Sequence, residues 1–142
     1  MQIKQIKYQS PEYEQSVILR DQILRKPLGM VFTDEFLKQD AKEFMIGVFE
    51  QNQIKAVLHL KPFSDTVLKM RQVAVDENLQ GKGYGSKLVL FSEEFARNKN
   101  YKKFVLHARE TAVSFYKKLN YNIIGEQFFE VGISHFKMEK KL

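Results

Sequence analysis

The stretch Val73–Leu88 limits the folds open to this chain more than any other. In chain order it reads as a short apolar strand, a polar turn, three glycines (Gly81, Gly83 and Gly85) and the start of a helix. Glycine lets a backbone approach a ligand closely. The first turn of a helix adds N–H groups without intrahelical partners at the positive end of its dipole. Because Lys82 adds a cation, we expect a phosphate-bearing ligand between Gln80 and Ser86.

Three known phosphate loops compete for this stretch. A P-loop needs adjacent Lys and Ser, but Lys82 and Ser86 are separated. A dinucleotide fingerprint needs G-x-G-x-x-G directly after the strand, whereas the glycines here follow G-x-G-x-G and come after a polar turn. The pattern that fits is Q/R-x-x-G-x-G/A, carried by Gln80, Gly83 and Gly85. The alternative is a tight strand-to-helix turn that uses glycine for its shape alone.

Composition narrows the class of protein. The 142 residues fit one domain, residues 1–142. There is no cysteine, which excludes disulfides, Cys-ligated zinc and thiol nucleophiles, and the three histidines have no metal-ligand spacing, so we predict no metal. No apolar run reaches about 18 residues, and the N-terminus lacks a signal-peptide core. We therefore expect a cytoplasmic protein without a membrane partner.

The net charge of +6 is compatible with a protein that binds nucleic acid. The lysines are scattered, however, and the only dense group is Lys137, Lys140 and Lys141. A solvated surface explains this better than a nucleic-acid interface, and a basic rim would also attract phosphates.

The order of apolar patterns predicts a single α/β (α+β) domain with a mixed, mostly antiparallel sheet flanked by helices. Ser10 and Pro11 begin a helix running to about Lys26. Expected core stripes lie on this helix (Tyr13, Val17, Ile18, Asp21 and Leu24) and on the helix after the glycines (Tyr84, Leu88, Phe91 and Phe95). With a short helix near 34–39 and another near 112–119, strands are expected at 2–8, 44–50, 54–60, 67–75, 103–107, 121–126 and 134–140. The order is β-α-α-β-β-β-α-β-α-β-β.

Together these features resemble the GCN5-related N-acetyltransferase (GNAT) family. The glycine loop matches the family's acetyl-CoA loop, and Ala112–Tyr121 looks like its A-x-x-F-Y-x-K-x-G-[FY] segment. Glu130–Met138 resembles the E-x-G-I-P-H-x-x-M tail of the ElaA-like and YjcF-like branch, and Arg20–Gly29 resembles an N-terminal segment of that branch. The likeness covers essentially the whole chain.

The resemblance implies a binding mode for acetyl-CoA. The strand residues Val73, Ala74 and Val75 would pair with the pantetheine arm, and one of their N–H groups would polarise the thioester. The pyrophosphate would be held by the loop: Gln80, Gly81, Lys82, Gly83, Tyr84, Gly85 and Ser86. Two positions depart from the family. Arg109 replaces a cofactor-contacting asparagine, and Asn120 replaces a glycine before an aromatic residue.

The resemblance also assigns candidates for proton transfer. Tyr116 corresponds to the tyrosine that protonates the departing thiolate, with a core aromatic beside Phe115 as the alternative. His107 and His135 are candidates for the general base because histidine titrates near neutral pH. Glu130 is a third candidate, placed at the acceptor. For all three a structural role is equally open.

The function that the resemblance implies is acetyl-CoA-dependent acetylation of a primary amine on a small molecule or peptide. Transfer from another acyl-CoA and a CoA-binding regulatory module without catalysis are the alternatives. We expect the N-terminal helices and residues 128–136 to form the acceptor wall. His59 is expected to be structural, the direction of Arg71 is open, and C-terminal edge strands leave a homodimer open.

Overall fold

The structure is a computed structural model that describes residues 1–142. Its strands and main helices are β1 Gln2–Ile6, α1 Pro11–Arg20, α2 Asp34–Lys38, β2 Phe44–Glu50, β3 Gln53–Pro62, β4 Val67–Val75, α3 Tyr84–Asn98, β5 Lys103–Arg109, α4 Val113–Lys118, β6 Asn122–Glu130 and β7 Ile133–Lys141. Shorter turns are the π-helical η1 Asp21–Arg25 and the 3₁₀ turns η2 Lys26–Leu28, η3 Gln39–Lys42, η4 Glu77–Leu79 and η5 Glu110–Ala112. The order of strands and helices is the predicted one.

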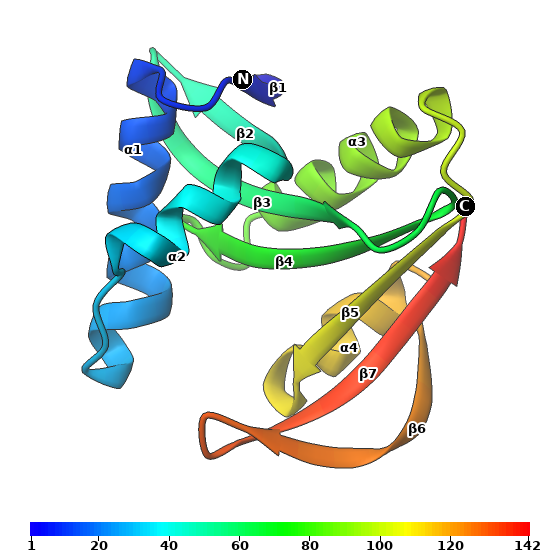
Figure 1. The fold of residues 1–142 in the computed structure, drawn as a ribbon. Coiled ribbons are helices and arrows are strands. Elements are labelled where there is room, and N and C mark those ends of the chain that lie inside the picture. The colour runs from blue at the N-terminus through cyan, green and yellow to red at the C-terminus, as the bar shows by residue number, and fades with distance from the viewer.

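The seven strands form one sheet in the order β1-β2-β3-β4-β5-β7-β6. Every neighbouring pair is antiparallel except β4 and β5, which are parallel. This confirms the predicted mixed, mostly antiparallel sheet. Figure 1 shows β4 and β5 starting close together and diverging along their length, so that the sheet opens into a V.

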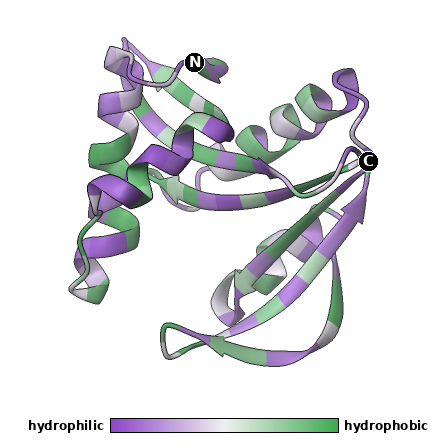
Figure 2. Ribbon diagram, in the orientation of Figure 1, coloured by the Kyte–Doolittle hydropathy of each residue, from purple (hydrophilic) through white to green (hydrophobic).

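The two faces of the sheet carry separate hydrophobic cores. Along β2, Met45 and Phe49 pack with Tyr13 and Leu19 of α1. The intervening Ile46 and Val48 belong to a larger core with Leu88 of α3, because successive strand residues point to opposite faces. Both α1 and α3 show alternating hydrophobic and hydrophilic bands (Figure 2). Helix α1 begins where expected, with the Ser10 hydroxyl accepting a hydrogen bond from the N–H of Tyr13.

Two predicted core positions are wrong. Ile18 is 60% exposed and Phe91 is 36% exposed. On α1 the buried positions include Ser16 and Arg20, and on α3 they include Ser92 and Glu93. These polar side chains are stabilised by specific partners: Glu93, for example, accepts hydrogen bonds from Tyr121 and Lys140 at 2.8 Å each.

One further local expectation agrees with the structure and another does not. Asn120 adopts a left-handed conformation with φ +73°, as its place after α4 requires. Strand β6 is longer than expected and continues to Glu130. No helix has the length and apolar character needed to cross a bilayer.

Candidate active site

The main cleft of the molecule lies where β4 and β5 separate. The two strands pair only from Val67–Met70 to Lys103–Leu106. Beyond that point β4 continues against β3 and β5 continues against β7. The facing edges of residues 71–75 and 107–109 therefore have no strand between them, and a cavity of about 1040 Å³ opens there. Backbone groups on these edges are available to an extended ligand.

A β-bulge shapes the β4 side of this cleft. The register between β3 and β4 shifts between Val57 and His59, and Gln72 has a left-handed φ of +54°. A non-glycine residue with positive φ is strained unless its surroundings hold it. The strain is located at the cleft, because Gln72 lines the cavity.

The glycine loop forms the floor at the start of α3. Gly83 has φ +88°, a conformation that a side chain would strain. The first helical hydrogen bond runs from the N–H of Lys87 to the carbonyl of Gly83 at 3.1 Å, so the N–H groups of residues 84–86 have no intrahelical acceptor. At Gly85 a Cβ would lie 3.3 Å from the Phe115 ring. Glycine thus lets α3 approach α4 at this point.

The cavity brings together most of the residues predicted from the sequence. Those that line it are Val73, Val75, Gln80, Gly81, Gly83, Gly85, Ser86, His107, Arg109, Tyr116, Glu130 and His135. Three predicted contacts do not line it. Ala74 is buried in the core beneath α1, Lys82 is exposed, and the Tyr84 hydroxyl donates to Glu50 at 2.6 Å.

Tyr116 lies against the cleft on α4. Its side chain is 6% exposed, and its ring packs edge-on against Phe115 and Tyr121. Burial raises the pKa of Tyr116 above its ordinary value, so its hydroxyl keeps the proton at neutral pH. This side chain can donate a proton or hydrogen bond into the cleft.

Two histidines approach the cavity from β5 and β7. The Nδ1 atom of His107 is 3.0 Å from Oε2 of Glu130. The Nδ1 atom of His135 is 2.7 Å from the carbonyl oxygen of Ile133, and its ring stacks on Phe128. When Nδ1 donates in each pair, Nε2 is left as a proton acceptor.

Three basic residues of the cavity wall were not predicted from the sequence: Arg25, Lys69 and Lys118. The direction of Arg71 was left open, and it also lines the cavity. The period-two rule could have found part of this set, since Lys69 and Arg71 must share one face of β4.

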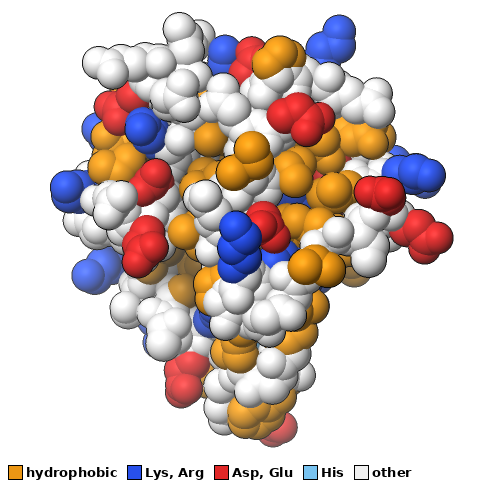
Figure 3. All heavy atoms as spheres, turned by 90° about the vertical axis from the view of Figure 1, so that its left-hand side faces the viewer, with side chains coloured by type: hydrophobic (Ala, Val, Ile, Leu, Met, Phe, Trp, Pro, Cys, Tyr) orange, Lys and Arg blue, Asp and Glu red, His pale blue; other side chains and the backbone are white.

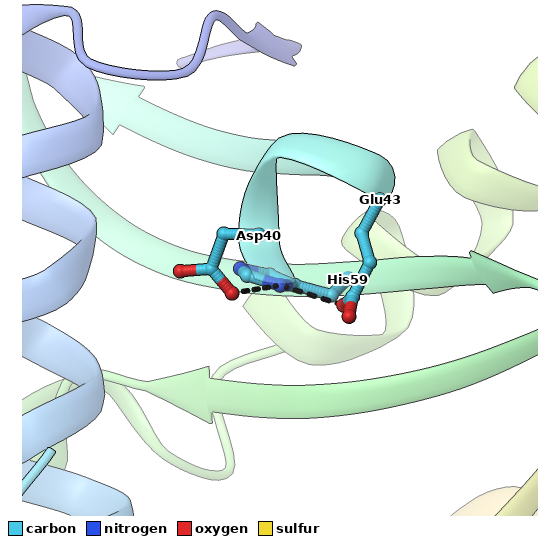
Figure 4. A group of neighbouring side chains, drawn as sticks. All are labelled: Asp40, Glu43 and His59. Atoms are coloured by element: carbon cyan, nitrogen blue, oxygen red, sulfur yellow. Dashed lines mark hydrogen bonds and ion pairs between the residues drawn. The ribbon is translucent and has the colours of Figure 1, made fainter. Parts of the chain in front are cut away.

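A buried polar cluster lies behind this wall, beneath α2. It contains the carboxylates Asp40 and Glu43 and the imidazole of His59 (Figure 4). Asp40 Oδ2 accepts from Arg20 Nη1 at 2.9 Å and from the Tyr13 hydroxyl at 2.7 Å. Arg20 Nη2 also contacts Asp40 Oδ1 at 3.4 Å, and His59 Nδ1 contacts Glu43 Oε1 at 3.1 Å. Because protein donors already use these carboxylate oxygens, the cluster is an ion-pair network.

His59 is fully buried in this network and does not line the cavity. Its Nδ1 lies 3.1 Å from Glu43 Oε1, whereas its Nε2 is buried without a partner. Because a carboxylate only accepts, Nδ1 carries the proton. Burial lowers the pKa of His59, since a second proton on Nε2 would add a charge with no acceptor.

Comparison with known proteins gives evidence that is independent of this geometry. The model of one family, described as an acetyltransferase (GNAT) domain, matches residues 12–142. The uncharacterised protein YyaT of Bacillus subtilis is 28% identical over 109 residues, which are 77% of this chain and 73% of YyaT. The uncharacterised N-acetyltransferase YjcF of the same organism is 32% identical over 73 residues, about half of each chain (51% and 52%).

Solved structures share the fold over the full chain. A crystal structure of a proposed N-acetyltransferase from Lactobacillus plantarum has a TM-score of 0.87 at 23% identity, covering 100% of this chain and 99% of that one. A GNAT family acetyltransferase from Elizabethkingia anophelis with acetyl-CoA bound has a TM-score of 0.76 at 20% identity, covering 99% and 97%.

Proposed function

The chain belongs to the acetyltransferase (GNAT) family, and from this premise we propose that it transfers an acetyl group directly from acetyl-CoA to a primary amine of a small molecule or peptide. The observation that carries the proposal is the cleft between β4 and β5. It joins a glycine loop at a helix N-terminus, free strand edges and a protonated tyrosine in one cavity.

The loop and strand suit the two ends of acetyl-CoA. The free N–H groups at residues 84–86 and the dipole of α3 favour the pyrophosphate. The unpaired edge of β4 offers backbone partners to the pantetheine arm. We assign the polarisation of the thioester carbonyl to an N–H group beside the bulge at Gln72, because a bulge re-aims neighbouring groups and both Gln72 and Val73 line the cleft.

Tyr116 is proposed as the general acid. The amine nitrogen attacks the thioester carbon, the carbon–sulfur bond breaks, and the thiolate takes the tyrosine proton. In this proposal the thiolate forms in the same poorly solvated environment as Tyr116. The burial that raises the pKa of Tyr116 therefore also disfavours the charged thiolate. Its hydroxyl makes no hydrogen bond within the protein that would compete with this donation.

His107 and Glu130 are proposed to remove the amine proton. Glu130 orients the imidazole through Nδ1, which leaves Nε2 to accept the proton. His135 has a similar tautomer, but its Nδ1 partner is a backbone carbonyl rather than a carboxylate. We therefore assign the base to His107 and a supporting role in the cavity wall to His135.

The test is release of CoA thiol from acetyl-CoA across a panel of amines, with Tyr116→Phe as the variant. Loss of a general acid should lower turnover by about 10²-fold or more, while the dissociation constant of acetyl-CoA stays unchanged. Binding of acetyl-CoA without amine-stimulated release would instead favour a CoA-binding module. Faster release from another acyl-CoA would change the donor assignment.

A further inference from the structure

Three cationic side chains line one part of the cavity, and none of them has a close ion pair with a carboxylate. Arg25 lies in η1, and Lys69 and Arg71 lie in β4. Arg25 and Lys69 form no ion pair within the chain. The only carboxylate near Arg71 is Glu43, at 3.8 Å from its Nε.

These cations lie on the opposite face of the sheet from the glycine loop. Lys69 and Arg71 alternate along β4 with Leu68 and Met70, which belong to the core beneath α3. Arg71 instead stacks over Phe36 of α2 at 5.6 Å. The three cations are therefore separated from the α3 N-terminus, where the phosphates of acetyl-CoA are proposed to bind. Figure 3 views the molecule from the α1 and α2 side, where hydrophobic side chains gather near the centre with charged ones among them.

Aromatic rings hold two of the cations in place. The Arg25 guanidinium lies 4.7 Å from the ring centroids of both Phe32 and Phe36. Phe36 is shared with Arg71, so one ring holds two like charges on the same wall. Such stacking orients a guanidinium while leaving its N–H groups free for a ligand.

The arrangement is electrostatically unfavourable without an anion. Burial lowers the pKa of Arg25, and the guanidiniums of Arg20 and Arg71 lower it further. Burial is also the main cause that lowers the pKa of Lys69, with Arg71 adding to it and Glu130 opposing it. An anionic group bound among these side chains would relieve the repulsion.

We propose that the amine acceptor is a small molecule that also carries an anionic group, a carboxylate or a phosphonate, and that Arg25, Lys69 and Arg71 bind this group. The inference rests on the proposed acetyl transfer and names its substrate class. The amine end is directed to Glu130, the one acidic side chain among the residues that line the cavity, which also contacts the proposed base His107. A polyamine would instead place cations against cations.

The test compares matched pairs of amines for binding to the CoA-bound protein by calorimetry. Suitable pairs are β-alanine and propylamine, aspartate and asparagine, and aminoethylphosphonate and ethylamine, with spermidine as the polycation. A hydrogen bond to a charged group corresponds to about 10- to 100-fold in affinity. We expect the more anionic member of at least one pair to bind about tenfold tighter or better.

Variants of two of the three cations test whether these side chains cause the preference for anionic amines. Arg71→Gln and Lys69→Gln should each weaken the preferred anionic amine about tenfold or more, with little change for its uncharged partner. Lys69→Glu should shift the preference toward spermidine. Lys141→Gln removes an exposed charge at the far end of β7 and is the matched control, with no expected effect.

Equal affinities within every pair, or no binding of any anionic amine, would overturn the inference. Acetyl-CoA binding and CoA release with any other amine are measured on the same samples. Turnover that prefers uncharged or polycationic amines would contradict the anionic substrate class but not the proposed acetyl transfer. A lack of acetyl-CoA binding would contradict the proposed function itself.

Discussion

Arg20 and Gln72 are 52 residues apart in the chain, yet the guanidinium of Arg20 donates two hydrogen bonds to the Gln72 side-chain oxygen. The distances are 3.3 Å from Nε and 3.2 Å from Nη2. Arg20 is fully buried and is itself held by Asp40. A charged side chain in the core therefore fixes the strained residue of the β4 bulge, beside the cleft.

This relationship predicts that Gln72→Met lowers turnover. Methionine has similar length but only a weak acceptor, so the bulge loses its anchor, and small misplacements of reacting groups can cost up to about 10²-fold in rate. Gln72→Glu keeps an oxygen for Arg20 and should retain more activity. Turnover and acetyl-CoA affinity are measured together, with exposed Gln5→Met as the control. Equal turnover in Gln72→Met and the wild type would show that the bulge needs no anchor.

The ion pair behind the cleft predicts a large stability effect. Asp40→Ala leaves Arg20 buried without its carboxylate, and breaking a buried pair costs about 3–5 kcal/mol. The double variant Arg20→Met with Asp40→Ala should cost less than the sum of the single changes, because no charge is left unpaired. Chemical unfolding measures both, with exposed Asp65→Ala as the control. Losses of unfolding free energy that simply add in the double variant would contradict the pairing of Arg20 with Asp40.

His59 predicts that acid destabilises the fold. Because its pKa is lower in the folded than in the unfolded protein, the unfolded chain binds an extra proton below the ordinary value near 6.5. The free energy of unfolding should therefore fall as pH drops below about 6.5, by up to about 1.4 kcal/mol per pH unit from this residue. His59→Asn, which keeps a donor for Glu43, should flatten that slope. An unchanged slope would exclude His59 as its source.

The glycine loop predicts a loss of affinity that stability alone does not explain. Gly83→Ala forces a side chain into the left-handed region, at a cost of about 1–2 kcal/mol, and should weaken acetyl-CoA binding about tenfold or more. Gly125 also has positive φ, +75°, with open space at its Cβ and a position outside the cavity lining. Gly125→Ala should therefore cost similar stability and leave the affinity intact. Equal losses of affinity in both variants would argue against a loop-specific role.

The sequence predicted the parts of the fold that local patterns encode. Strand β4 has the expected bounds, Val67–Val75, because its alternation and flanking turns are local. The left-handed Asn120 was predicted because one residue type at one position suffices. The stripes on α1 and α3 were partly wrong, since Arg20 and Glu93 are buried by partners distant in sequence.

The site could be predicted only where a short pattern carries it. The glycine loop and the Phe115–Tyr116 pair lie close in sequence to the residues that define them. The bulge at Gln72 has no such signal, because a left-handed glutamine in a strand depends on Arg20. The meeting of Arg25 with Arg71 over Phe36 likewise depends on how α2 packs against the sheet.

Direct acetyl transfer is tested by following the acetyl group itself. The protein is incubated with acetyl-CoA carrying a deuterated acetyl group and with the amine panel, and the amines are analysed by mass spectrometry. We expect the label to appear as an amide on the accepting amine, in proportion to the CoA released, and Tyr116→Phe to slow both together. Intact acetyl-CoA, or label recovered only as free acetate, would contradict direct acetyl transfer.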